Sequence, residues 1–153
     1  MTRFILSALF LLSVLIITVP QAHAQERFSD MEAGLMIGEP TGLSFKMWRN
    51  NKTAIDAGLA WSFSDDGSLH IHGDYLLHNW LEVEEGSLAF YYGIGARIRV
   101  TSNSKFGARI PAGLQYLMEG SRIGFFFEIA PILNLLPDTD LDVNGGIGAR
   151  YFF

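Results

Sequence analysis

The sequence predicts an all-β fold, namely an eight-stranded antiparallel up-and-down transmembrane β-barrel that follows a cleavable signal peptide. Three observations support this prediction. Apolar residues alternate with small or polar residues along most of the chain after residue 30, which is the period of a strand. Short clusters of turn-forming residues interrupt the alternation. The 153-residue chain contains no cysteine, so no disulfide holds the fold together.

Residues 1 to 24 have the three parts of a signal peptide. Arg3 supplies the positive charge, residues 4 to 19 form an apolar run, and Ala22-His23-Ala24 fits a small-x-small cleavage site. The apolar run of about 16 residues is shorter than the roughly 20 residues that a spanning helix needs. We therefore expect cleavage after this site and a single domain over residues 25 to 153.

Eight segments with period two follow in order, without a convincing helical period between them. The predicted strands cover residues 31–39, 42–49, 53–63, 69–78, 87–100, 105–118, 122–135 and 141–153. Each connection is short and rich in turn formers. The connections are centred on Pro40, Asn50-Asn51, Asp65-Asp66-Gly67, Glu84-Glu85-Gly86, Ser102-Asn103-Ser104, Glu119-Gly120-Ser121 and Pro137-Asp138-Thr139.

The alternation separates a bulky apolar face from a small or polar face in every strand. In the third strand Ile55, Leu59 and Trp61 share one face, and Asp56 and Gly58 share the other. The interior of an eight-stranded barrel is just wide enough for side chains, so these bulky sets do not fit inside it. We therefore expect the apolar face to meet lipid and to carry no charge, because one Arg or Lys at the midplane costs roughly 2–4 kcal/mol.

Aromatic residues near the strand ends are typical of the two girdles that flank the apolar band of a transmembrane barrel. The expected girdle residues are Trp48, Trp61, Phe63, Tyr75, Trp80, Tyr116 and Tyr151. The alternative is that they fill the core of a β-sandwich. Two prolines, Pro111 and Pro131, fall inside predicted strands and remove ladder donors, so we expect a bulge or bend where they approach each other.

Four segments of this chain resemble a family of small, functionally uncharacterised bacterial outer-membrane β-barrel proteins. The members of this family have the size of the OmpA and OmpX barrels. The four segments are residues 38–44 (GEPTGLS), 54–61 (AIDAGLAW), 91–97 (YYGIGAR) and 144–153 (NGGIGARYFF). The resemblance implies a compact barrel in the outer membrane of a Gram-negative bacterium, and we expect it to be a monomer. It implies outer-membrane lipid and the barrel-insertion machinery as partners, with Tyr151 and Phe153 as the insertion signal. It implies no activity.

Charge and loop length limit the remaining functions. Without residues 1 to 24 the chain keeps 10 basic and 16 acidic residues, and this net charge of about −6 argues against nucleic acid as a partner. The connections near residues 40, 66, 103 and 138 would lie on the cell surface, and they are shorter than the external loops of most such barrels. Adhesion through long loops is therefore disfavoured.

The polar face carries charges of both signs, which predicts a network of ion pairs that fills the lumen. The expected members are Glu32, Lys46, Asp56, Asp74, Arg97, Arg99, Arg109, Glu128, Asp142 and Arg150. The alternative for the same residues is a conducting pore. Lys105 belongs to the same basic group as the arginines of the fifth and sixth strands.

Two further arrangements of the polar face are weaker candidates for chemistry. His70 and His72 form an H-x-H pair that a carboxylate could complete as a metal site, although the expected register places only Ser62 and Ala60 opposite them. Ser62, His70 and Asp74 resemble the residue types of a hydrolytic triad, but they face one another only in one register. We therefore predict no catalytic residue, no metal and no cofactor.

The sequence as a whole favours a structural or membrane-maintenance role for a barrel with a polar, salt-bridged lumen and no catalysis. One alternative is a small pore or a lipid-modifying outer-membrane enzyme. Another is a soluble periplasmic barrel that binds an apolar ligand. In that case the barrel would be inverted, with Phe90, Phe125 and Phe127 buried and the arginines in water.

Overall fold

The computed structural model describes residues 30 to 64 and 67 to 153, so the predicted signal peptide lies outside the described residues. The described part of the chain forms one antiparallel sheet of nine strands, which confirms the predicted all-β class. The strands are β1 (Met31–Glu39), β2 (Thr41–Trp48), β3 (Thr53–Ser62), β4 (Ser68–Leu81), β5 (Ser87–Val100), β6 (Lys105–Arg109), β7 (Ala112–Leu117), β8 (Ile123–Leu136) and β9 (Asp140–Phe152). No helix among these residues is long and apolar enough to cross a bilayer.

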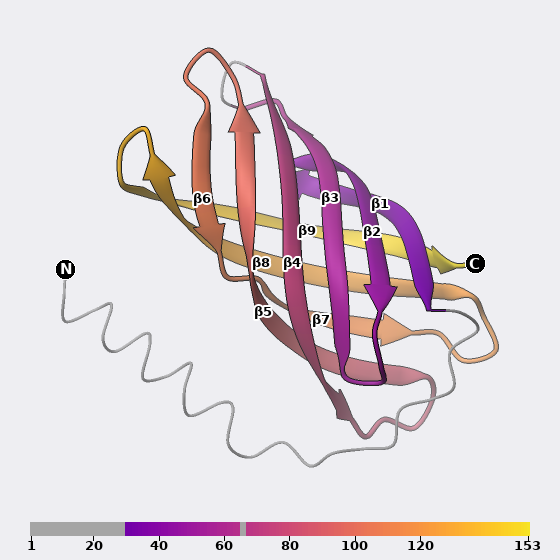
Figure 1. Cartoon of the computed structure of the whole chain (residues 1–153). Coiled ribbons are helices and arrows are strands. Elements are labelled where there is room, and N and C mark those ends of the chain that lie inside the picture. The colour runs from indigo at the N-terminus through magenta and orange to yellow at the C-terminus, as the bar shows by residue number, and fades with distance from the viewer. Residues whose placement is uncertain (1–29, 65–66) are drawn as a thin grey trace.

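Apart from β6 and β7, strands that follow one another in the chain are paired antiparallel, and the first strand also pairs with the last. β1 contacts β2 on one side and β9 on the other, from Glu32↔Phe152 to Glu39↔Gly145. The succession of pairs therefore returns to its starting strand, and Figure 1 shows the strands wrapped around a common interior. The start of β1 and the end of the chain lie at the same end of the barrel, since the Phe153 amide donates to the Met31 carbonyl at 3.2 Å. We call this the terminal end and the opposite one the far end.

β6 and β7 are two collinear parts of one interrupted strand. This explains why the structure has nine strands although eight were predicted. β5 pairs with β6 as Gly95↔Arg109 and with β7 as Tyr92↔Ala112, which is one unbroken register. The ladder is interrupted only at residues 110 and 111. The predicted sixth strand, residues 105 to 118, is thus present but divided by its proline.

The prolines approach each other as expected, but the bulge is elsewhere. Ile110 N donates to the Pro131 carbonyl at 3.0 Å, and Gly93 N donates to the Pro111 carbonyl at 3.0 Å. The carbonyl groups of the prolines therefore stay in the ladder, although neither proline has an N–H to donate. The register shift between β6 and β8 falls at Phe106 and Gly107, several residues from Pro111.

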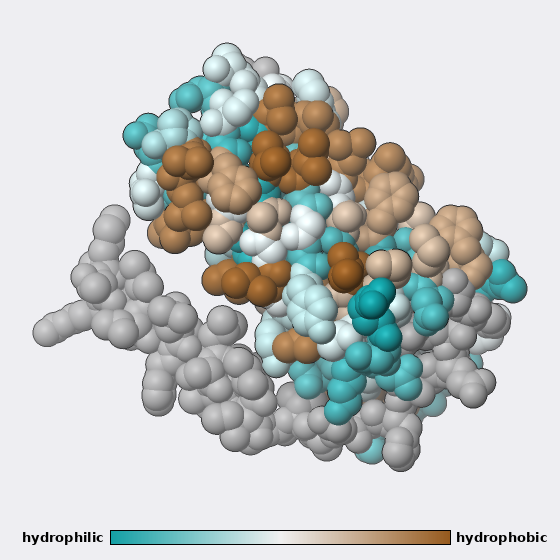
Figure 2. Space-filling model, in the orientation of Figure 1, coloured by the Kyte–Doolittle hydropathy of each residue, from teal (hydrophilic) through white to brown (hydrophobic). Residues whose placement is uncertain are grey.

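The structure places the apolar residues outside and the charges inside. Phe125 and Phe127 are 45% and 46% exposed, whereas Arg97 is fully buried. The inverted arrangement expected of a soluble barrel is therefore wrong for this chain. Figure 2 shows hydrophobic residues spread across the outer face in view, with hydrophilic residues gathered towards its ends. Glu39, at the far end of β1, is an exposed charge among the alternating outer residues of that strand.

Two of the seven expected girdle aromatics do not face outward. Trp48 and Trp80 are 3% and 4% exposed and pack inside the terminal end with Ala54, Ala89, Leu117 and Phe152. Their even positions in β2 and β4 are those of the inward residues, so the strand parity contradicts a girdle position. Trp61, Phe63, Tyr75 and Tyr151 are exposed on the outer surface.

The seam between β1 and β9 depends on a glycine. Gly34 lies opposite Arg150, and a Cβ at this position would overlap the backbone carbonyl of Ala149. Because backbone cannot give way as a flexible side chain can, we expect Gly34→Ala to lower the free energy of unfolding by about 1–3 kcal/mol. Denaturant titration of the protein in detergent measures this loss.

Gly145 on the same pair of strands provides the control for this prediction. A Cβ at Gly145 would lie 3.5 Å from the Glu128 carbonyl oxygen, an ordinary contact. Gly145→Ala should leave the unfolding midpoint nearly unchanged. Equal losses in the two variants would show that close approach at the β1–β9 seam is not what Gly34 provides.

Candidate functional site: the polar interior

Aromatic rings and a lysine occupy the terminal end of the interior. The ring centroids of Trp48 and Trp80 are 5.8 Å apart, and His78 lies 4.3 Å from Trp48. The Nζ of Lys46 sits 4.6 Å from the centroid of the Tyr91 ring. Cation–π contact of this kind is strongest where water is excluded. The terminal end is thus closed by packed rings and not by charge alone.

Lys46 and Glu32 are joined through neutral partners. Lys46 Nζ donates to Gln115 Oε1 at 2.7 Å and lies 3.1 Å from His78 Nε2. Gln115 Nε2 in turn donates to both Glu32 oxygens at 3.2 Å, and the Trp48 indole N–H also donates to Glu32. The side-chain amide of Gln115 therefore links the positive charge of Lys46 to the negative charge of Glu32.

A second group, which we call the central cluster, consists of Asp56, Asp74, Arg109, Glu128 and Arg150. Arg109 Nε donates to Asp74 Oδ2 at 2.8 Å, and its NH2 group donates to Glu128 Oε1. Arg150 NH2 donates to Asp56 Oδ2 at 2.6 Å. All five side chains are buried, so these ion pairs lie in an environment where a lost partner is costly.

Neutral side chains complete the hydrogen bonding of the central cluster. Tyr91 donates its hydroxyl to Glu128 Oε2 at 2.8 Å, and Arg150 Nε donates to Ser44 Oγ at 2.9 Å. The guanidinium carbon of Arg150 lies 3.8 Å from the centroid of the Phe126 ring. The cluster is held by five different strands, because its members come from β3, β4, β6, β8 and β9.

His72 lies beside two carboxylates of the central cluster. Its Nε2 atom is 3.6 Å from Asp56 Oδ1 and 3.9 Å from Asp74 Oδ2. His72 and the two aspartates thus form a compact group of three buried metal-ligand types, with one ligand atom of each within 4.8 Å of the others. His70, the other expected metal candidate, is not a member of this group.

Arg97 organises the interior towards the far end. Its guanidinium donates to Asn134 Oδ1 at 2.8 Å, to Asn144 Oδ1 at 3.3 Å and to Asp142 Oδ2 at 3.0 Å. Arg99 NH1 lies 3.7 Å from the same Asp142 oxygen. Asp142 is about one-third exposed, so this group reaches the mouth of the barrel.

An exposed ion pair lies at the far mouth. Lys105 Nζ donates to Asp140 Oδ2 at 2.8 Å, with both side chains partly exposed. Surface pairs of this kind contribute little stability because water screens them. Lys105, which the sequence places in one basic group with the arginines of the fifth and sixth strands, pairs here with the first residue of β9.

Ser62, His70 and Asp74, the three residues considered as a hydrolytic triad, are not brought together. Ser62 lies opposite Ser68, while Ala60 lies opposite His70 and Gly58 opposite His72, so the expected register was wrong by two residues. Ser68, and not Ser62, contacts His70, with Ser68 Oγ 2.9 Å from His70 Nε2. Asp74 is held by Arg109, so it does not orient His70.

The two residues expected to act as the insertion signal lie on the outer surface at the terminal end. Tyr151 is opposite Ala33 on one side and Ile123 on the other. The rings of Tyr151 and Phe153 meet edge to face at 5.8 Å. Both rings are exposed, so they are accessible to lipid or to a protein at this end.

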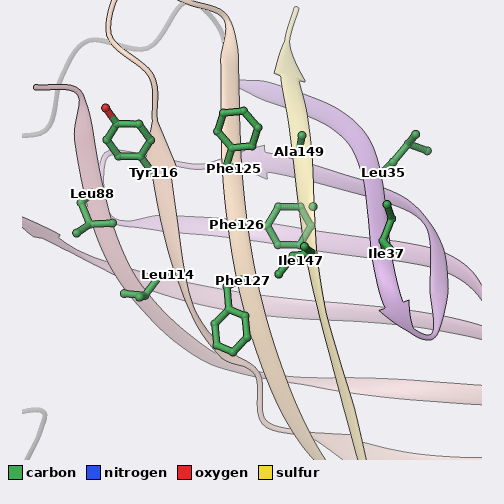
Figure 3. A pocket seen from close by; sticks show the side chains of 11 residues that line it. Leu35, Ile37, Leu88, Leu114, Tyr116, Phe125, Phe126, Phe127, Ile147 and Ala149 are labelled. Carbon is green, nitrogen blue, oxygen red and sulfur yellow. The ribbon is translucent and has the colours of Figure 1, made fainter.

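The outer surface carries one apolar groove of about 600 Å³ over β1, β5, β7, β8 and β9 (Figure 3). Phe125, Phe127 and Ile147 line it, and Gly148 and Ala149 leave it open in the middle. The Tyr116 hydroxyl is a polar group of the lining, and it donates to the Glu85 carbonyl at 3.3 Å. The groove has the surface chemistry of a hydrocarbon contact.

Comparison with solved structures supports the fold. The chain is similar to the N-terminal β-barrel domain of Pseudomonas aeruginosa OprF, with a TM-score of 0.65 and 13% sequence identity over 80% of this chain and 97% of that domain. At this identity the similarity concerns the fold alone, which is that of a β-barrel domain. No protein-family model matches the chain. No curated protein matches it either.

Several interior residues were missed because they are neutral. Gln115, Asn134, Asn144 and Tyr91 connect the charges, and Ser44 supports Arg150. Their inward parity was visible in the sequence. What the sequence did not show is which strands lie opposite each other across the interior, because that depends on the stagger of the whole barrel.

Proposed function

We propose that this chain is a closed, eight-stranded transmembrane barrel in the outer membrane of a Gram-negative bacterium. In this count β6 and β7 are the two parts of one interrupted strand. The observation that carries the proposal is the exposure of large apolar side chains around buried arginines and carboxylates. Exposed apolar area on this scale is unfavourable in water but matches hydrocarbon. A ring of pairs without a free edge is also what a bilayer requires of strands.

The proposed role is structural or membrane-maintaining, without catalysis. The interior charges support it, because Arg97, Arg109 and Arg150 are engaged by several acceptors from different strands. Such contacts fix the relative position of strands and fill the lumen. The apolar groove supports outer-membrane lipid as a partner. The barrel-insertion machinery would be needed for assembly, and a monomer suffices because each strand is paired on both sides.

Two measurements test this role. In planar bilayers, the filled interior predicts no steady conducting steps from the purified protein, and ion-selective steps would favour the alternative of a small pore.

In cells, we expect deletion of the gene for this protein to raise the permeability of the outer membrane to large antibiotics. Expression of the Ser62→Ala or His70→Ala variant in the deletion strain should restore the permeability barrier fully. Failure of these variants to restore it, with normal protein levels, would favour the lipid-modifying enzyme.

A further inference from the structure

We propose that Asp56, His72 and Asp74 form a binding site for one divalent transition-metal ion, with zinc as the best-fitting member. The inference goes beyond the proposed membrane role, and it rests only on the arrangement of the interior. Imidazole and carboxylate ligands together suit zinc and its neighbours better than calcium or magnesium.

The geometry of the three side chains carries the proposal. Ligand atoms that each lie about 2.0–2.2 Å from one ion are separated from one another by roughly 3–4 Å. His72 Nε2 is 3.6 Å from Asp56 Oδ1 and 3.9 Å from Asp74 Oδ2. Because all three ligand atoms lie within 4.8 Å of one another, side-chain rotation could bring them to the separations that one ion requires. Three protein ligands would leave the fourth position for water.

A second observation points to a missing cation. Asp74 Oδ1 is buried and has no hydrogen-bond partner among the described residues, although its other oxygen is held by Arg109. A buried carboxylate oxygen without a donor is unfavourable. Asp74 Oδ2 is the oxygen nearest His72 and already accepts from Arg109, so an ion bound by Asp74 would engage the unpartnered Oδ1 beside it, together with Oδ2 or in its place.

The two arginines fit the role of outer partners that orient the ligands. Arg150 binds Asp56 through Oδ2 and leaves Oδ1 directed towards His72. Arg109 binds Asp74 through Oδ2, the oxygen nearest His72, and leaves Oδ1 without a hydrogen bond. Carboxylate ligands in metal sites are commonly hydrogen-bonded by such partners.

Local charge and local space also favour a cation. The central cluster together with Glu32 and Lys46 contains four carboxylates and three cationic side chains, so this part of the interior has one negative charge in excess. Arg97 and Arg99, which share the single carboxylate of Asp142, balance it towards the far end. The nearby Arg97, which pairs in register with His72, directs its guanidinium at Asn134, Asn144 and Asp142. Glycines make room for the ligands: a Cβ at Gly58 would overlap the His72 ring, and one at Gly95 would overlap Asp74 Oδ1.

The test uses the untagged protein, extracted from outer membranes, stripped with a chelator and equilibrated with zinc or cobalt. We expect about one tightly bound zinc per chain by elemental analysis, and visible absorption from cobalt held by nitrogen and oxygen ligands. His72→Gln and Asp74→Asn should each weaken binding by more than about tenfold. His70→Gln is the matched control, because His70 lies on the same strand and face but contacts Ser68 instead.

Unchanged electrophoretic heat-modifiability in each variant shows that the barrel is intact, which separates loss of the site from loss of the fold. Zinc bound to wild type and His70→Gln but not to His72→Gln would support the site. Absence of stoichiometric zinc, retention in His72→Gln, or equal loss in His70→Gln would overturn it. A heat-modifiable barrel that binds no metal would leave the proposed membrane role standing.

Discussion

Ile147→Arg is expected to destabilise the barrel in a bilayer by about 2–4 kcal/mol, because it places a charge near the middle of the outer side of β9, which we propose faces lipid. Ile147 is 59% exposed and lies between Ile37 and Phe127 on the neighbouring strands, where apolar side chains surround it. In water the same change would replace an exposed apolar residue by a charged one and would cost little. The sign and size of the effect therefore report on the surrounding phase.

Leu141→Arg provides the matched control for this change. Leu141 belongs to the same strand and the same outer face, but it lies at the far end, where β9 begins. The cost of Arg near an interface is only about 0–1 kcal/mol. Folding titrations of both variants in lipid vesicles measure the difference. Similar small effects at the two positions would contradict a lipid-facing outer surface.

Arg109→Leu is expected to lower the free energy of unfolding by about 3–5 kcal/mol, since it leaves the buried carboxylates of Asp74 and Glu128 without their shared partner. The leucine fills part of the volume, so the loss arises mainly from the uncompensated charge. Arg109→Lys should recover part of the stability, because the ammonium restores the charge but not the two-sided hydrogen bonding.

The control for Arg109 is Lys105, which lies on the same strand β6 and forms an exposed ion pair with Asp140 of β9. Lys105→Ala removes an ion pair of similar length, but water screens it, so we expect almost no change in the free energy of unfolding. Denaturant titration in detergent measures both variants. A loss for Arg109→Leu as small as that for Lys105→Ala would show that the central cluster does not hold the strands together.

The sequence predicted most of the fold because period-two alternation carries both the strand and its orientation. Parity alone placed Arg97 inside and Phe125 outside, and the turn residues located the hairpins. The errors arose where another rule competed. The expectation that tryptophans lie at interfaces outweighed the inward parity of Trp48 and Trp80, and that choice was wrong.

The candidate site was less predictable than the fold. Hairpin neighbours follow from a turn, yet a two-residue error in the β3–β4 register placed Ser62 opposite His70, where the structure has Ala60. The serine that contacts His70 is Ser68 of the same strand. Contacts across the interior, such as Arg150 with Asp56, join residues 94 positions apart in the chain. They depend on the stagger that closes the barrel, and no local pattern in one strand encodes it.

The most direct test of the account is the electrophoretic mobility of the protein from outer-membrane fractions, run with and without boiling. A closed barrel that resists detergent should migrate as a compact species until it is boiled and then shift to the mobility of the unfolded chain. We predict this shift for the protein in the outer-membrane fraction. A protein that shows no shift and is recovered in the soluble periplasmic fraction would contradict the transmembrane barrel.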